Sequence, residues 1–191
     1  MTDVDYGPLQ SLIGEWRGDR GMDKAPEQAA EAEDGLVQEP YHETLIFEAA
    51  GLVGNAGEQT LAILRYRQQV FRNSTGEQFH DEQGYWLWDC ERELIMHSLL
   101  IPRGLSLLAG GSYRRAEVGT LLEFDVMAEA GDSEWAIAQS PFLQEKAKTT
   151  RFEKKMSVEG DELHYFQTTF LDIYGRKVAH TDENRLRRVS G

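Results

Sequence analysis

Histidine side chains are the first residues to consider for metal binding or proton transfer at neutral pH. The chain has five: His42, His80, His97, His164 and His180. No two stand at a spacing that would place both on one face of a single element, so paired ligands on one helix or strand are not predicted. Ligands from separate strands can still meet in space. His180 is the leading candidate, because it begins a segment typical of a closing β-strand and shares a strand face with Asp182 and Asn184.

Five further residues are candidates for contact with a ligand. His97 shares a strand face with apolar residues and is predicted to be a core or cavity histidine. Trp86 and Trp88 alternate on one face of a strand and Tyr85 lies on the other, a pattern that fits core packing or stacking against a ligand. Arg103 lies in a Pro-x-Gly turn, where it could meet a carboxylate at the mouth of a barrel or remain solvated.

Sequence motifs of the common enzyme classes are absent. The chain has no GxSxG, no P-loop, no GxGxxG after a strand, no HExxH and no CxxC. Its 33 acidic residues are too many for a catalytic carboxylate pair to be singled out. The sequence therefore favours a binding protein over an enzyme and predicts no catalytic residue.

Charge and composition exclude several kinds of partner. The formal net charge of −13 argues against nucleic acid and against an anionic membrane surface, since both are bound by clustered Lys and Arg. The single cysteine rules out an internal disulfide and fits a reducing compartment. We see no signal-peptide pattern at the start and no apolar run of the ~20 residues that a membrane helix needs. A cytoplasmic protein is expected.

The elements that must position these residues are mainly β-strands. Strands are predicted at 43–49, 59–72, 80–89, 93–101, 104–110, 117–129, 148–158, 162–172 and 177–189. A short amphipathic helix is predicted over Pro8–Trp16, and an irregular connection over 132–148. The acidic, alanine-rich stretch 21–40 is predicted to be a loop insertion near the barrel mouth.

Strands joined by tight turns predict an all-β fold. We expect a single domain over 1–191, an antiparallel up-and-down β-barrel of about nine to ten strands of the calycin or lipocalin type, with a short N-terminal helix. Such a barrel is wide enough to hold one small ligand.

Four blocks of sequence resemble a known family. LIGEWRG (12–18), PYHETLIFEAAG (40–51), HDEQGYWLWDCERELIMHSLLIPRGLSLLAGGS (80–112) and the closing LRRV (186–189) are similar, in this order, to the nitrobindin family. The first block corresponds to that family's Gly-x-Trp-x-Gly-x-Gly, except that Arg20 stands in place of the last glycine and Gly21 follows one residue late. Trp16 would then plug the closed end of the barrel, and Glu43 matches the family's acidic position.

The resemblance implies a function as well as a fold. Nitrobindins are ten-stranded barrels that bind haem b through one histidine and are associated with nitric oxide binding and peroxynitrite isomerisation. Carried over, His180 would be the proximal haem ligand. His180 stands one residue further from the LRRV ending than the family pattern, which predicts an outward side chain unless a bulge at Thr181–Asp182 restores its direction.

Two classes of function remain open at this point. The first is a nitrobindin-like barrel for a small hydrophobic ligand, with haem b the leading cofactor candidate and peroxynitrite isomerisation its activity only when loaded with haem. The second is a haem-free carrier of a small amphipathic ligand, similar to fatty-acid-binding proteins. The oligomeric state is open, with a homodimer as one option.

Overall fold

The computed structural model describes residues 4–26 and 36–189, and in this part of the chain nearly every residue lies in a strand or a tight turn. The strands are β1 (Gly14–Pro26), β2 (Leu36–Asn55), β3 (Gln59–Arg72), β4 (Gln78–Asp89), β5 (Leu94–Ile101), β6 (Leu105–Arg115), β7 (Leu122–Glu129), β8 (Ile137–Gln139), β9 (Ala147–Glu159), β10 (Glu162–Ile173) and β11 (Arg176–Arg188). A 3₁₀ helix, η1 (Gly7–Leu12), and one helical turn, α1 (Pro141–Lys146), complete the described structure.

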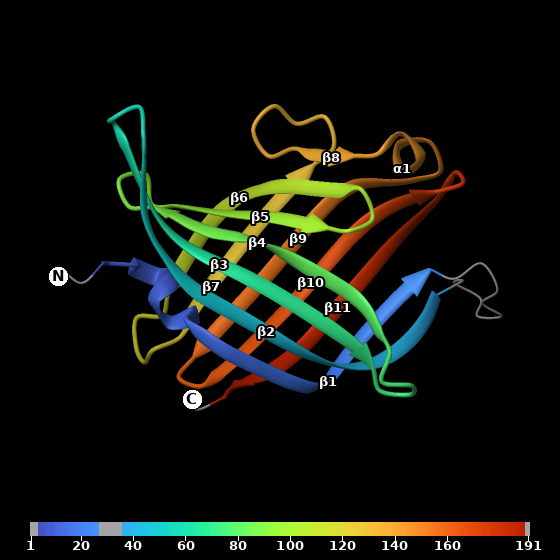
Figure 1. Ribbon diagram of the computed structural model, residues 1–191, viewed down its shortest axis with the longest axis horizontal. Helices are drawn as coiled ribbons and strands as arrows, with labels where there is room; N and C mark the ends of the chain where they lie inside the picture. The colour runs from blue at the N-terminus through green and yellow to red at the C-terminus, as the bar shows by residue number, and fades with distance from the viewer. Residues whose placement is uncertain (1–3, 27–35, 190–191) are drawn as a thin grey trace.

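The strands close into a barrel (Figure 1). Each strand pairs antiparallel with its neighbour in the order β1 to β7, then β9, β10 and β11, and β11 returns to pair with β1. The short β8 adds to β6 outside this ring. Closure of the barrel pairs the two edge strands, whose backbone groups could otherwise pair with another chain. This explains why a sequence of long alternating strands folds into a closed barrel. The predicted antiparallel barrel is confirmed.

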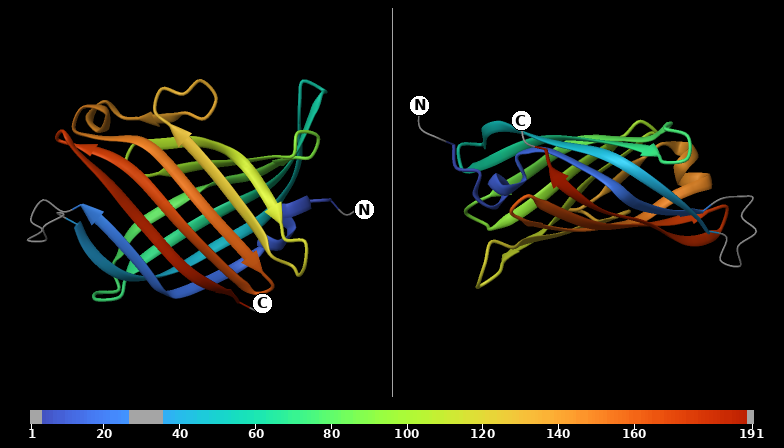
Figure 2. Two further views of the ribbon diagram at one scale, coloured as in Figure 1. Left: turned by 180° about the vertical axis from the view of Figure 1, so that it is seen from behind. Right: turned by 90° about the horizontal axis from the view of Figure 1, so that it is seen from below.

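The two ends of the barrel differ. Figure 2 shows η1 beside the N-terminus at one end and α1 at the other, with the walls crossing between them. Among residues 4–26 and 36–189, no helix is long and apolar enough to cross a bilayer.

Two predictions about the elements are wrong. The helix expected over Pro8–Trp16 is a 3₁₀ helix that ends at Leu12, and Trp16 already belongs to β1. Residues 21–26 and 36–40, expected in a loop insertion, are strand residues of β1 and β2 and pair with each other out to Pro26 and Leu36. The acidic composition of this stretch concealed the alternation. The remaining residues of the expected insertion, 27–35, lie outside the described part of the chain.

The end of the barrel beside η1 is closed by a packed apolar core. Trp16, Leu9 and Leu12 are fully buried there, and the Trp16 indole Nε1 donates a hydrogen bond to the Leu12 carbonyl at 2.7 Å. The guanidinium of Arg188 lies 4.1 Å from the centre of a Trp16 ring. This is the plug predicted from the Gly-x-Trp motif, and it ties β1, β11 and η1 together.

A bulge in β1 sets the direction of its second half. Arg17 pairs with Arg187 and Met22 with Glu183, so β1 advances five residues while β11 advances four. The same shift appears against β2, between Gly18 and Gly21. Because one extra residue reverses the inside–outside alternation, Asp23 faces the interior, whereas uninterrupted alternation from Trp16 would turn it outward.

The first prediction tests the plug. Trp16→Ala should lower the free energy of unfolding by about 3–5 kcal/mol, because it removes a fully buried indole and leaves a cavity. The control is Tyr85→Ala, at a side chain that is 46% exposed on the outer face, which should cost less than about 1 kcal/mol. The measurement is urea unfolding followed by circular dichroism. Equal losses in both variants would contradict the plug role.

Candidate functional site

A layer of hydrogen-bonded polar side chains crosses the barrel interior. Glu43, on β2, is 2% exposed and accepts hydrogen bonds from the Tyr165 hydroxyl and the Asn184 amide, each at 2.8 Å. The Gln68 amide donates to its other oxygen at 2.5 Å. Burial raises the pKa of Glu43, and these three hydrogen bonds only partly oppose that rise.

A buried ion pair lies in the same layer. The Glu82 carboxylate accepts a hydrogen bond from the Tyr66 hydroxyl at 2.7 Å and lies 3.8 Å from the Lys154 Nζ. His80 lies on its other side, with Nε2 3.3 Å from the second carboxylate oxygen. Burial alone would raise the pKa of Glu82, but the attraction of Lys154 and the His80 contacts hold it well below its usual range.

His97 belongs to the packed side of this layer. Its ring is fully buried and stacked on Trp86 at 4.4 Å between centroids, and its Nε2 lies 2.8 Å from the Tyr66 hydroxyl oxygen. Because the Tyr66 hydrogen is donated to Glu82, we infer that Nε2 carries the proton of His97. Within residues 4–26 and 36–189, the Nδ1 atom has no hydrogen-bond partner. Burial, reinforced by the Lys154 charge, lowers the pKa of His97 to about 3.

On the other side of the polar layer lies a cavity of about 390 Å³. It sits at the end of the barrel away from η1, among the last residues of β1, β3 and β5 and the first residues of β4, β9 and β11. Apolar side chains such as Val70, Ile101 and Leu171 form part of its lining. Tyr41, Glu82 and His80 also line it and connect it to the polar layer. A largely preformed pocket with a few converging polar groups is the usual form of a small-molecule site.

Three ionisable side chains gather on one wall of this cavity. His180 Nε2 lies 2.6 Å from an Asp23 oxygen and 3.5 Å from an Asp182 oxygen. Burial on its own would disfavour a charged ring, but the hydrogen bonds and charges of Asp182 and Asp23 outweigh it and raise the pKa of His180 to about 10. At neutral pH the ring is therefore an imidazolium held by two carboxyl groups.

The structure corrects the predicted direction of His180. Strand β11 pairs with β10 without interruption from Arg176 to Arg187, so there is no bulge at Thr181–Asp182. The residues that face inward are His180, Asp182, Asn184 and Leu186, and all four fit one unbroken alternation. The expected outward side chain is wrong, because β11 has no bulge and an even spacing of six residues keeps His180 on the same face as the buried Leu186.

The other sequence candidates separate into two groups. Arg103 lines the mouth of the cavity, where its guanidinium donates to the Phe79 carbonyl at 3.2 Å. Trp86 and Trp88 are buried in the packed half, and Trp86 pairs directly across β4 and β5 with His97. Tyr85 lies on the outer face, so its selection as a ligand contact is wrong. Of the selected residues, only His180 and Arg103 line the cavity.

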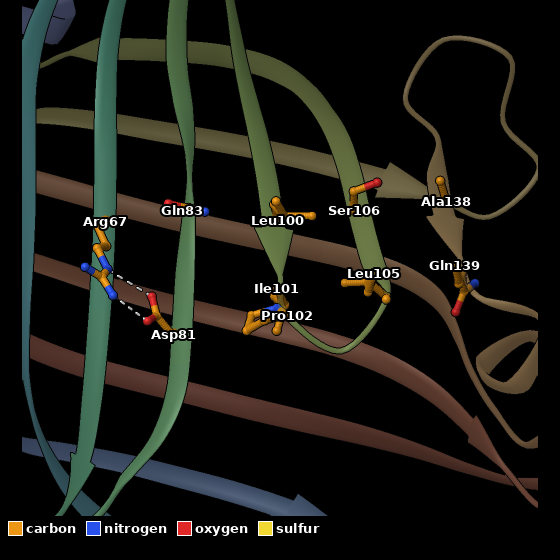
Figure 3. A pocket seen from close by; sticks show the side chains of 11 residues that line it. Arg67, Asp81, Gln83, Leu100, Ile101, Pro102, Leu105, Ser106, Ala138 and Gln139 are labelled. Carbon is orange, nitrogen blue, oxygen red and sulfur yellow. Dashed lines mark hydrogen bonds and ion pairs between the residues drawn. The ribbon is translucent and has the colours of Figure 1, made fainter.

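A second depression lies on the outer wall and is shown in Figure 3. It measures about 550 Å³ and is lined by Arg67 of β3, by Asp81 and Gln83 of β4, and by residues of β5, β6 and β8. Its charges are already matched, since Arg67 and Asp81 form two hydrogen bonds at 2.7 and 3.1 Å. An exposed, internally paired groove is a weaker candidate than the cavity inside the barrel.

Comparison with known families agrees with this geometry. Residues 5–188 match the family model described as the THAP4-like, heme-binding beta-barrel domain. The chain belongs to this family. The match extends over nearly the whole chain and confirms the resemblance to haem-binding barrels seen in the sequence.

A solved structure shares the THAP4-like barrel. The crystal structure of Rv2717c from M. tuberculosis superimposes with a TM-score of 0.71 at 23% sequence identity, covering 98% of this chain and 100% of that one. At this identity the likeness supports the fold alone. A search of curated proteins returns no match.

Several cavity residues were missed at the sequence level. Asp23 was hidden in the stretch predicted as a loop, and its approach to His180 spans 157 positions of sequence. Asp182 carried a usable signal, because it shares a strand face with His180. The sequence around Glu82 and Lys154 did not predict that they form a buried ion pair, because nothing near them distinguishes them from the many other charged residues.

The second prediction concerns His97. Its pKa in the folded protein is lowered from 6.5 to about 3, so as pH falls through this range only the unfolded chain takes up its proton and the folded state loses stability. Replacing His97 by Phe removes that loss. Between pH 7 and pH 5, His97→Phe should gain about 2 kcal/mol of unfolding free energy relative to wild type in urea titrations.

The control for this experiment is Leu100→Phe, because Leu100 is 48% exposed and carries no titratable group. The stability difference between Leu100→Phe and wild type should not change with pH. A His97→Phe difference that is equally flat would show that the buried ring is protonated in the folded protein.

Proposed function

We propose that this barrel binds a small amphipathic molecule with an anionic group in the cavity at the end away from η1. The observation that carries the proposal is the cavity itself, whose lining combines apolar strand residues with hydrogen-bonding and charged side chains. The family match supports a ligand-binding barrel.

Two arginines favour an anionic ligand group. Arg72 and Arg103 both line the cavity, one at the end of β3 and the other in the turn between β5 and β6. Arg72 lies over the Phe79 ring at 4.6 Å and pairs with Glu39 at 3.1 Å, which holds its guanidinium at the rim. Arg103 is exposed and has guanidinium donors free to reorient toward a carboxylate or sulfonate.

The third prediction uses two matched probes. The fluorescent anion 1-anilinonaphthalene-8-sulfonate should bind with one-to-one stoichiometry. Arg103→Gln and Arg72→Gln should each weaken its binding about tenfold, the value of one charge-assisted hydrogen bond. The neutral analogue N-phenyl-1-naphthylamine, which lacks the sulfonate, should bind these variants about as well as it binds wild type.

Arg67→Gln provides the matched control, because Arg67 lies in the outer groove of Figure 3. It should leave the binding of both probes unchanged. Loss of anion binding in Arg67→Gln instead would move the site to the outer wall, and the absence of one-to-one binding by either probe would refute the proposal.

Haem b is the second candidate ligand, favoured by the family's description and by the inward direction of His180. An axial ligand to haem iron is a neutral imidazole with a free lone pair. The Nε2 of His180 is instead engaged by Asp23 and Asp182. As it lies, this side chain does not fit haem ligation, so we assign neither haem-dependent chemistry nor peroxynitrite isomerisation to the cavity.

The fourth prediction tests this disagreement. Added hemin should give wild type only the broad absorption of unligated hemin, whereas the double substitution Asp23→Asn, Asp182→Asn should sharpen the Soret band by releasing His180. Adding His180→Ala to that variant should remove the gain. A sharp Soret band in wild type that His180→Ala abolishes would mean that haem displaces both carboxyl groups, and would establish haem as the ligand.

A further inference from the structure

The wall that carries His180 has an unusual charge arrangement. Asp23 on β1 and Asp182 on β11 are direct cross-strand partners, and both side chains face the cavity. Like charges placed opposite each other on a sheet repel, and a cation between them relieves that repulsion. The ring of His180, two residues from Asp182 on the same strand, occupies that place.

The three side chains have the composition of a metal-binding set. One nitrogen of His180 and one carboxylate oxygen from each aspartate lie within 4.8 Å of one another. Around a tetrahedral zinc ion with bonds of about 2.0–2.1 Å, ligand atoms are roughly 3.3 Å apart. The separations from His180 Nε2, 2.6 Å to Asp23 and 3.5 Å to Asp182, bracket this value. Side-chain rotations that lengthen the His180–Asp23 contact would bring the donors to the spacing of an ion.

We infer that Asp23, His180 and Asp182 form a binding site for a divalent transition-metal ion of the zinc class. On binding, His180 would release its Nε2 proton to solvent, and the metal would take the position of that proton between the carboxylates. Unlike haem iron, this ion would keep both carboxylates as ligands. An imidazole nitrogen in the set favours such an ion over Mg²⁺ or Ca²⁺, which prefer oxygen ligands throughout. The two strands are paired in register beside the site, so the donors are held by the barrel wall and not by a loop (Figure 2).

Three protein ligands would leave a coordination position open on the side of the cavity. Zinc sites with three protein ligands use this position for water or for a ligand group. A carboxylate or similar anion entering the cavity could then bind the ion directly, with Arg72 and Arg103 near the mouth. This last step rests on the proposed function, whereas the metal site itself does not require an organic ligand.

The experiment is calorimetric titration of Zn²⁺ into the full chain after dialysis against a chelator. Wild type should bind one ion per chain, and Zn²⁺ should raise its thermal midpoint through preferential binding to the folded state. His180→Gln, Asp182→Asn and Asp23→Asn should each weaken affinity more than about tenfold, since losing even a supporting residue of a metal site has effects of that size.

Two exposed residues provide controls, His42→Gln and Asp161→Asn, which should change the affinity less than about twofold. Co²⁺ gives a second readout, because its visible spectrum should show nitrogen coordination that His180→Gln removes. If His180→Gln fails to fold, as judged by circular dichroism, the nearly isosteric Asp182→Asn decides the question.

Absence of one-to-one Zn²⁺ binding, or binding that all three cluster variants retain, would overturn the inference. Binding of the naphthalene probes is measured separately in the presence of chelator. Probe binding without Zn²⁺ binding would refute only the metal site, and Zn²⁺ binding without probe binding would refute only the proposed ligand function.

Discussion

The ion pair between Glu82 and Lys154 is the constraint on which the barrel interior depends. Both side chains are almost completely buried, so each charge has lost its hydration and must be matched by neighbours. Tyr66 and His80 contact the carboxylate, and the ammonium lies 5.0 Å from the centre of the Tyr165 ring. Removing either side chain of the pair would leave the other charge buried without a partner, so the hydrogen-bonded polar layer has to form as a unit. The apolar core of the barrel ends where this polar layer begins.

This layer divides the barrel into two halves with different roles. On one side, Trp16, Trp86 and His97 are almost completely buried in a packed aromatic and aliphatic core. On the other, the cavity begins at Tyr41, Glu82 and His80, whose polar atoms form part of its lining. In a haem-binding family, an aromatic cluster inside the barrel could be mistaken for a cofactor-binding site. Here the stacking interactions of these aromatic side chains stabilise the fold.

Sequence patterns were sufficient for the barrel and insufficient for the site. Alternation in strands such as β7 and the Gly-x-Trp plug are local signals, and local signals predict strands, turns and buried faces. The Asp23–His180 contact joins positions 157 residues apart and depends on the pairing of the first strand with the last. The direction of His180 was mistaken for a different reason. It was judged against the spacing of the family pattern, whereas the unbroken alternation of β11 itself turns the side chain inward.

The bulge in β1 has a consequence for comparing members of this family. The face on which Asp23 lies is decided by the number of residues between Gly18 and Gly21, not by their identity. A homologue one residue shorter there would carry the same aspartate on its outer surface, beside an unchanged His180. A comparison of residue identities alone would treat the two proteins as equivalent. Only one of them, however, would direct all three metal-binding side chains into its cavity. Within this family, the length of the first strand is therefore as informative about the interior as the residues that compose it.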